Sequence, residues 1–240
     1  MNPDIISSKD NPRIKALAKL YDHPSRDAFI VEGFHSVEVA YSCGALKEVY
    51  ALNDPHLKGI KCTLVNEAIL KKLSKAVTFE KIIGLCQLPK YEGFAGDILI
   101  LDRIQDPGNI GTLLRTAASF GFEDVIFLKG SCSPFNAKVI ASSEGSLFHI
   151  RLHYAEEAGL VEMLHKEGYT VLGSALEHAE AMETYHRPDH KIALILGNEG
   201  QGMSKLLLVE TDANLKITIR KMESLNVGVA GGILMHYLSK

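Results

Sequence analysis

Two runs of apolar residues, each followed by a glycine-containing turn, constrain the fold of this chain more than any other feature. Ile98–Leu101 precedes the turn 107–111 (Pro-Gly-Asn-Ile-Gly), and Ile192–Leu196 runs into 197–202 (Gly-Asn-Glu-Gly-Gln-Gly). Short runs without a polar interruption are typical of strands that are buried on both faces of a parallel sheet. In α/β sheets, ligands bind beside the turns that follow such strands. The sequence therefore predicts a mostly parallel α/β sheet with a ligand site at its carboxyl edge.

Polar side chains stand in these turns and in a third turn near the end of the chain. The third turn follows the apolar stretch 217–219 and reads Glu-Ser-Leu-Asn over 223–226. The candidates for chemistry are an arginine, a glutamate, a serine and two asparagines, namely Arg115, Glu199, Ser224, Asn109 and Asn226. Because the carboxyl ends of parallel strands lie at one edge of a sheet, these turns predict a single composite site. The chain is accordingly predicted to be an enzyme.

Most of these residues also have a structural explanation. Asn109 stands where it can cap the helix that follows, and Arg115 can be a solvated residue on that helix. Glu199 can accept hydrogen bonds from backbone amides at a helix start. Asn226 is the exception, because it falls inside the first turn of a helix predicted over 224–238. The glycines match neither the Rossmann nor the P-loop spacing, so no phosphate-binding loop is indicated.

The other local patterns predict two α/β domains. Asn11-Pro12 and Asn66 are typical of helix starts. The segment 89–96 holds two glycines and one proline, which predicts a linker between a domain over 1–90 and a domain over 97–240. Besides the two runs above, strands are expected at 29–31, 47–51, 61–65, 82–88, 125–128, 170–173 and 215–219. Besides the helix over 224–238, helices are expected at 35–42, 66–73, 110–120 and 156–165.

The charge distribution indicates which half of the chain binds a polyanion. The formal net charge is −3, which excludes a protein that coats nucleic acid by bulk electrostatics. Residues 1–95 carry a net charge of +2 and residues 96–240 carry −5. Four cations near the N-terminus are the candidates for contact with a nucleic acid: Lys9, Arg13, Lys15 and Arg26. A solvated helix face is the alternative explanation for these cations.

Cysteine usage and hydropathy favour a reduced cytoplasmic compartment. Cys43, Cys62, Cys86 and Cys132 have no paired spacing, and the ten histidines show no ligand pattern, so no metal site is expected. No apolar run is long enough to span a bilayer, and the N-terminus lacks the pattern of a signal peptide. The sequence therefore predicts a cytoplasmic protein with neither membrane nor metal as a partner.

The three turns together resemble the motifs of the SpoU/TrmH family of RNA 2′-O-ribose methyltransferases, within the SPOUT superfamily. The motifs lie in order at 109–115, 196–202 and 217–227, and the resemblance covers 98–240. The stretches 8–15 and 29–33 resemble a ribosomal-protein-like RNA-binding domain that many rRNA-directed members carry. The resemblance implies a C-terminal SPOUT methyltransferase domain with a deep trefoil knot and a smaller N-terminal α/β domain.

The resemblance also implies a cofactor, a set of site residues and an assembly. S-adenosylmethionine would be held in the knot near Gly197, Ile217 and Leu225. The residues that match polar site positions of the family are Arg115, Asn109, Glu199, Ser224 and Asn226. A homodimer would form through the C-terminal helix. The N-terminal domain favours ribosomal RNA over transfer RNA as the substrate.

Two other functional classes fit parts of the sequence. A nucleotide-dependent enzyme for small molecules would also use glycine-rich turns at strand ends, although it would not explain the basic N-terminal stretch. A non-catalytic RNA-binding protein could retain the same scaffold without transferring a methyl group. Cofactor preference and the effect of Arg115→Ala on methylation distinguish these alternatives from an RNA methyltransferase.

Overall fold

The structure is a computed structural model that describes residues 4–75 and 79–239 of the 240-residue chain. By its internal contacts the chain divides into two compact units. The first unit contains the described residues up to Lys90 and the later segment Pro134–Phe148, and the second contains Tyr91–Ser133 and His149–Lys240. The sequence division placed 134–148 in the second domain, but this segment packs on the first unit, where Phe135 and Phe148 contact the ring of Phe29.

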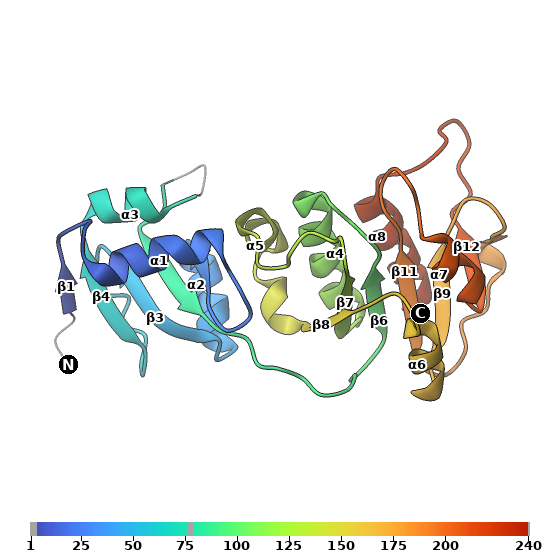
Figure 1. The fold of residues 1–240 in the computed structure, drawn as a ribbon, viewed down its shortest axis with the longest axis horizontal. Coiled ribbons are helices and arrows are strands. Elements are labelled where there is room, and N and C mark those ends of the chain that lie inside the picture. The colour runs from blue at the N-terminus through green and yellow to red at the C-terminus, as the bar shows by residue number, and fades with distance from the viewer. Residues whose placement is uncertain (1–3, 76–78, 240) are drawn as a thin grey trace. The chain divides into compact units, whose positions relative to one another are not determined.

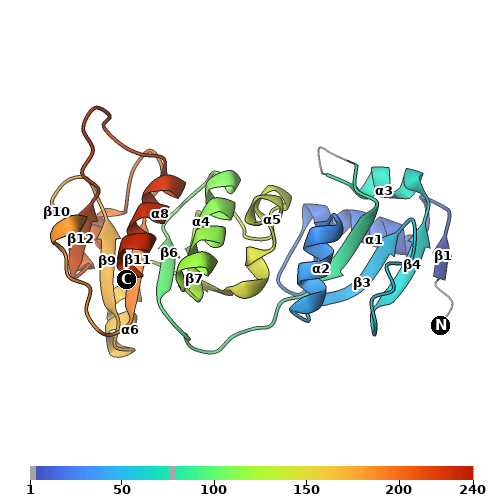
Figure 2. The same cartoon turned by 180° about the vertical axis from the view of Figure 1, so that it is seen from behind.

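The first unit is built on a five-stranded mixed sheet with the strand order β1-β4-β3-β5-β2. Its elements are β1 (Asp4–Ile6), α1 (Pro12–Asp22), β2 (Phe29–Glu32), α2 (Phe34–Ser42), β3 (Leu46–Ala51), β4 (Lys61–Val65), α3 (Glu67–Leu73), β5 (Ile82–Cys86) and α5 (Ala137–Ser143). Helices α1 and α3 cover one face of this sheet and α2 covers the other (Figures 1 and 2). The predicted helix starts are confirmed, since Asn11 accepts from the amide of Arg13 and Asn66 from the amide of Ile69.

The second unit holds a seven-stranded sheet with the strand order β10-β12-β9-β11-β6-β7-β8 (Figure 1). Its strands are β6 (Ile98–Leu101), β7 (Asp124–Leu128), β8 (Arg151–Ala155), β9 (Thr170–Ser174), β10 (Glu180–Ala181), β11 (Ile192–Leu196) and β12 (Ala213–Lys216). Its α-helices are α4 (Pro107–Phe120), α6 (Leu160–Lys166), α7 (Lys205–Glu210) and α8 (Val227–Leu238). The pairings described in this sheet are all parallel, which confirms the predicted α/β class.

The two apolar runs of the sequence are neighbours at the centre of the second sheet. β11 pairs with β6 in a register that places Leu196 opposite Leu101. Their residues are completely buried, because helices cover both faces of a sheet built from parallel crossovers. The turns after β6 and β11 therefore begin side by side, and this register brings the first two motifs together.

Two predicted elements near the third motif were placed wrongly. β12 ends at Lys216, and 217–219 is not a strand because Ile217 and Ile219 line a cavity rather than pair with a neighbouring strand. Helix α8 begins at Val227, three residues later than predicted, because the Asn226 side chain accepts hydrogen bonds from the amides of Gly228 and Val229. The predicted helix over 156–165 is observed only as Leu160–Lys166.

The segment predicted as a linker, 89–96, is bound to the second unit from Tyr91 onward. Asp124 is completely buried and accepts from the amides of Ala95 and Gly96 at 2.7 and 3.1 Å. His153 contributes a third contact at 2.7 Å to the same carboxylate. Burial acts to raise the pKa of Asp124, but these hydrogen bonds outweigh it and leave the pKa below its usual value. The end of the predicted linker is thus a fixed part of the second unit.

We expect Asp124→Asn to destabilise the protein by about 3 kcal/mol at neutral pH, because it removes a buried charge that several donors face. The lowered pKa means that the carboxylate contributes stability above its unfolded pKa of about 4, and that this contribution is lost as the pH falls through the folded value. Urea unfolding at pH 7 and at about pH 3.5 measures both effects. The difference between wild type and variant should shrink at the lower pH, and an equal difference at both pH values would contradict the assignment.

Candidate functional site

A cavity of about 790 Å³ lies at the carboxyl ends of β9, β11 and β12. Its lining comes mainly from three loops, namely 174–178, 197–203 and five residues between 217 and 225, with further residues from α7 and α8. The predicted cofactor-binding residues Gly197, Ile217 and Leu225 all line this cavity. Glu199 and Ser224 line it as well. Within the described residues, Asn109, Asn226 and Arg115 are outside the lining.

The sequence predicts cofactor contact in the loop 197–203, which is called the cofactor loop below. This loop closes tightly and requires glycine at its first position. The amides of Asn198 and Gly202 each donate to the carbonyl of the other, at 3.0 and 2.9 Å. A Cβ at Gly197 would lie 2.1 Å from the backbone nitrogen of Met203. The side chain of Asn198, which the sequence did not single out, accepts from the amides of Gly200 and Gln201 and holds the turn from inside.

A chain of hydrogen bonds joins the three motifs beside this cavity. Asn109 Nδ2 donates to Glu199 Oε1 at 3.0 Å, and Asn226 Nδ2 donates to Asn109 Oδ1 at 2.9 Å. Glu199 also accepts from the backbone amides of Gln105 and Asp106, at 3.4 and 3.3 Å. The residue that links the first motif to both others is therefore Asn109, and its amide group is held from both sides.

Glu199 is an ionised acceptor in this arrangement. Its partial burial acts to raise the pKa, but hydrogen bonds from Asn109 and from nearby backbone amides more than offset that effect, and the pKa lies below its usual value. A carboxylate with a lowered pKa is a weak proton acceptor at neutral pH. The geometry thus fits a role for Glu199 in orienting Asn109 better than a role as a general base.

The two asparagines have the opposite capping roles to those that the sequence indicates. Asn109 is not the cap of α4, because Asp106 is the capping residue and accepts from the amide of Asn109 at 2.9 Å. Asn226, for which the sequence suggested no capping role, is the cap of α8. Arg115 is exposed and lies on α4 about one and two-thirds turns beyond Asn109. The helix is regular from Pro107, so the irregular first turn that would bring Arg115 beside the same cleft is not observed.

Residues 97–236 match the SpoU rRNA methylase family. This chain belongs to that family. The 23S rRNA (guanosine(2553)-2′-O)-methyltransferase RlmP of Bacillus subtilis is 34% identical over 244 aligned positions, which cover 97% of this chain and 98% of that protein. An uncharacterised tRNA/rRNA methyltransferase of Synechocystis is 28% identical and covers 96% of this chain and 92% of its own length.

Solved structures of SpoU and TrmH proteins share the fold along nearly the whole chain. A putative RNA methyltransferase of the TrmH family from Porphyromonas gingivalis superposes with a TM-score of 0.85 at 27% identity, covering 95% of this chain and 97% of that one. An rRNA methyltransferase from Sinorhizobium meliloti, solved with AdoMet bound, gives a TM-score of 0.88 at 23% identity and covers 98% and 97%. These matches confirm the predicted SpoU-type α/β fold.

The four predicted RNA-binding cations of this SpoU chain have different surroundings. Arg13 forms ion pairs with Asp4 and with Glu48, so its guanidinium is engaged within the first unit. Lys15 is exposed and pairs with Asp10 at 3.1 Å. Lys9 is exposed. Arg26 donates to the carbonyl of Pro89 at 3.3 Å.

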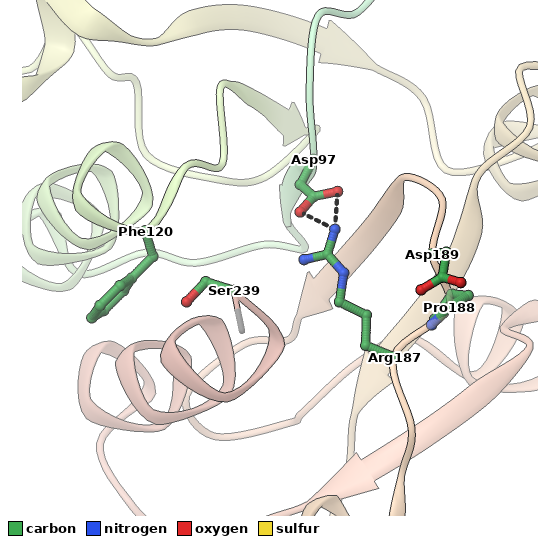
Figure 3. A pocket seen from close by; sticks show the side chains of 6 residues that line it. All are labelled: Asp97, Phe120, Arg187, Pro188, Asp189 and Ser239. Carbon is green, nitrogen blue, oxygen red and sulfur yellow. Dashed lines mark hydrogen bonds and ion pairs between the residues drawn. The ribbon is translucent and has the colours of Figure 1, made fainter.

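A second, smaller cavity of about 420 Å³ lies in the second unit, at the opposite edge of its sheet (Figure 3). Here Arg187 pairs with Asp97 at 2.8 Å and donates to the carbonyl of Leu238 at the end of α8. Asp97 also accepts from the amide of Ile192, so the carboxylate holds the amino ends of β6 and β11 together. These contacts fix the C-terminal end of α8.

The described residues contain no cluster of His, Cys, Asp or Glu that could hold a metal ion, and no helix with the length and apolarity to cross a membrane.

Proposed function

We propose that this chain methylates a ribose 2′-hydroxyl of ribosomal RNA, with S-adenosylmethionine as the methyl donor, in the cytoplasm. The observation that carries the proposal is the junction of three motif segments at Asn109, beside a cavity of cofactor size, in a member of the SpoU family. The relative RlmP, which aligns with nearly the entire chain, is named as a 2′-O-methyltransferase of 23S rRNA. We infer the same class of reaction and substrate for this protein.

The cavity fits the proposed cofactor in size and in charge. Its volume of about 790 Å³ lies within the roughly 300–1,000 Å³ that small-molecule sites occupy. Three carboxylates, Glu177, Glu199 and Glu223, stand in the lining against one lysine, Lys205. An acidic lining favours a ligand with a sulfonium and an ammonium group over a polyphosphate. The acidic lining therefore favours S-adenosylmethionine over ATP or NAD. We assign Gly197, Ile217 and Leu225 to the binding of S-adenosylmethionine.

The proposed residues align and activate a poor nucleophile. When bound, S-adenosylmethionine would supply an electrophilic methyl group for the ribose oxygen, its sulfonium would become a neutral thioether, and the hydroxyl proton would pass to solvent. Asn109, fixed by Glu199 and Asn226, would present its remaining N–H to the ribose. Ser224, on the cavity wall, would position the same sugar.

Arg115 is proposed as a fixed cation rather than a base, because a guanidinium stays protonated in proteins. Because α4 does not bring Arg115 beside the cavity of its own chain, Arg115 would bind the phosphate next to the target ribose, and stabilise the developing alkoxide, at the site of the other copy in the proposed homodimer. We expect Arg115→Ala to lower kcat by roughly 100-fold or more while the affinity for S-adenosylmethionine stays within about twofold. Transfer of tritiated methyl groups to rRNA and calorimetric titration of the cofactor measure the two quantities. Wild type that binds the cofactor but transfers no methyl group would instead favour a non-catalytic RNA-binding protein.

The first unit is proposed to hold the RNA through the lysines of α1 and α3. Lys72 Nζ donates to the carbonyl of Lys9 at 3.1 Å, so the loop before α1 and the helix α3 are adjacent. Lys15 and Lys19 are exposed on α1, beside α3. The proposed phosphate-binding surface therefore consists of Lys9, Lys15, Lys19 and Lys72. Arg13 is left out of it, because Asp4 and Glu48 engage its guanidinium. Arg26 remains a candidate near the end of the unit.

We expect Lys72→Glu to weaken RNA binding severalfold and to reduce the dependence of log Kd on log salt by about one, as loss of a phosphate contact does. Filter binding of rRNA fragments between about 50 and 200 mM salt measures both values. Lys58→Glu is the matched control, because it changes the net charge equally in the loop that Tyr41 of α2 contacts. Equal effects of the two substitutions would exclude α1 and α3 as the RNA-binding surface.

A homodimer and a trefoil knot remain parts of the proposal. Helix α8 is apolar except for His236 and Tyr237. Val229 on this helix is 53% exposed, and Ile233, one turn later, is half-buried. A second copy of the chain would cover this apolar strip. The knot is expected only from the resemblance of the three motifs to the SPOUT superfamily.

A further inference from the structure

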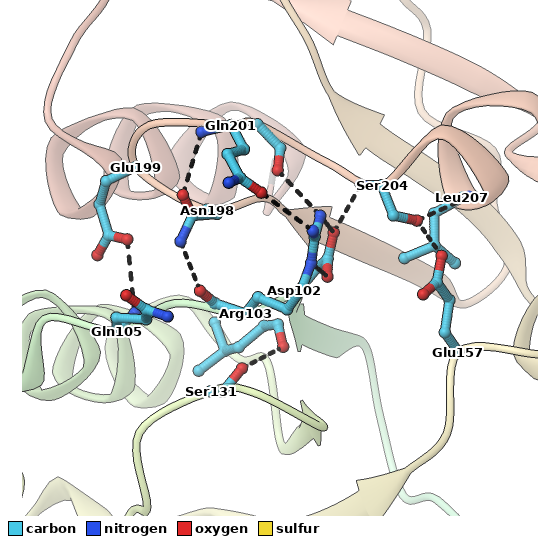
Figure 4. A network of polar contacts seen from close by, with 12 residues as sticks. Asp102, Arg103, Gln105, Ser131, Glu157, Asn198, Glu199, Gln201, Ser204 and Leu207 are labelled. Atoms are coloured by element: carbon cyan, nitrogen blue, oxygen red, sulfur yellow. Dashed lines mark hydrogen bonds and ion pairs between the residues drawn. The ribbon is translucent and has the colours of Figure 1, made fainter.

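Arg103 lies between the first motif and the cofactor loop and belongs to none of the three motifs. It is the second residue after β6, and its guanidinium makes two contacts with Asp102, from Nε at 2.7 Å and from Nη2 at 3.1 Å (Figure 4). Asp102 is only 1% exposed. The other side of the guanidinium reaches the cofactor loop, where Nη1 donates to Gln201 Oε1 at 3.5 Å and Nη2 to the carbonyl of Gly202 at 3.4 Å.

The same pair of residues holds the cofactor loop at both ends. Asn198 Nδ2 donates to the carbonyl of Arg103 at 2.8 Å, next to the start of the loop. The amide of Ser204, just after the loop, donates to Asp102 Oδ2 at 2.8 Å. Four hydrogen bonds thus connect Asp102 and Arg103 with residues 198–204, and Figure 4 shows the side chains converging on this point.

The backbone conformation of Arg103 indicates that these contacts hold the residue in place. Its φ of +57° lies in the left-handed region, which arginine adopts rarely and at a conformational cost. Gly130 lies against its side chain, since a Cβ there would be 3.1 Å from Arg103 Cγ. Residues kept in such a conformation cluster at ligand-binding sites when surrounding contacts determine them.

We propose that Arg103 is a positioning residue that fixes the cofactor loop, and hence the shape of the cavity in which the methyl donor binds. The inference rests on the proposed function, because it assigns the loop to the cofactor. The planar guanidinium suits this task, since it can face a carboxylate on one side and a carbonyl on another, which a lysine ammonium cannot reproduce with the same geometry. Arg103 acts through the loop, so its loss should affect cofactor binding more than RNA binding.

Three substitutions separate the side-chain contacts from the backbone conformation. Arg103→Gly removes the contacts and permits the positive φ, whereas Arg103→Ala removes the contacts and leaves the φ unfavourable. Arg103→Lys retains the charge and the stem. Lys166→Ala is the control, because Lys166 is exposed on α6 and pairs only with Glu162 among the ion pairs described. The assays are calorimetry with S-adenosylmethionine, hydrogen exchange of the peptide that contains 197–203, filter binding of RNA, and thermal melting.

We expect Arg103→Gly to raise the Kd for S-adenosylmethionine about tenfold, equivalent to about 1.4 kcal/mol, with faster exchange in 197–203 and unchanged RNA affinity. Arg103→Ala should show a larger effect and Arg103→Lys an intermediate one. Wild-type exchange in 197–203 together with wild-type cofactor affinity in Arg103→Gly and Arg103→Lys would overturn the proposal. If the wild-type protein binds no S-adenosylmethionine, the proposed function fails, while the exchange rates still decide whether Arg103 fixes the loop.

Discussion

Replacing Asn109 by alanine is expected to lower kcat for RNA methylation by about 100- to 1,000-fold. Asn109 is the residue through which the second and third motifs are joined, with hydrogen bonds of 3.0 Å to Glu199 and 2.9 Å from Asn226. Its removal leaves both partners without their shared contact and leaves the ribose without the N–H that would orient it. Single-turnover methylation of rRNA at saturating cofactor measures the effect without interference from product release.

A matched substitution on the same helix controls for damage to α4. Ser119 is exposed and its hydroxyl donates to the carbonyl of Arg115, so Ser119→Ala should change kcat by about twofold or less. Asn109→Asp provides a second test, because it places a carboxylate opposite Glu199 at the position of a donor. Activity of Asn109→Ala within twofold of wild type would rule out the proposed role of the junction.

Gly197→Ala is expected to raise the Kd for S-adenosylmethionine by about 100-fold. The added methyl group would lie 2.1 Å from the Met203 nitrogen and 2.3 Å from the Gly202 carbonyl carbon, so the two ends of the cofactor loop must move apart. These obstructing atoms are backbone atoms, which cannot move aside as a flexible side chain can. Calorimetric titration and a melting curve separate a displaced loop from an unfolded protein.

Gly200→Ala is the comparison for Gly197→Ala within the same loop. A Cβ at Gly200 would meet only Asn198 Oδ1, at the ordinary contact distance of 3.7 Å. We therefore expect a change in cofactor affinity of about twofold. Similar losses in the two variants would mean that the close approach of the loop ends does not control the cavity.

The sequence predicted the elements whose stability is mostly local or fully buried. The strands at 98–101 and 192–196 were predicted with the observed bounds, because uninterrupted apolar runs leave few alternatives in a parallel sheet. The strand at 61–65 was also predicted with the observed bounds, although it contains Lys61 and Thr63. The helix starts at Asn11 and Asn66 were also predicted, because a capping side chain acts within three residues.

Features that depend on contacts between distant parts of the chain could not be predicted from local sequence patterns. The stretch 217–219 looks like a strand, but Ile217 and Ile219 face a cavity formed by other loops. The segment Pro134–Phe148 joins the first unit through rings that contact Phe29. The network around Asp102 and Arg103 connects residues about a hundred positions apart, and no local pattern marks it.

The central claim, that the three motifs together methylate a ribose of ribosomal RNA, is tested most directly by mapping 2′-O-methylation in rRNA. The comparison uses a strain that lacks this gene, complemented either with the wild-type gene or with the Asn109→Ala variant. We predict that one ribose methylation disappears in the deletion strain, returns with the wild-type gene and does not return with the variant. An rRNA methylation map that is identical in all of these strains would contradict it.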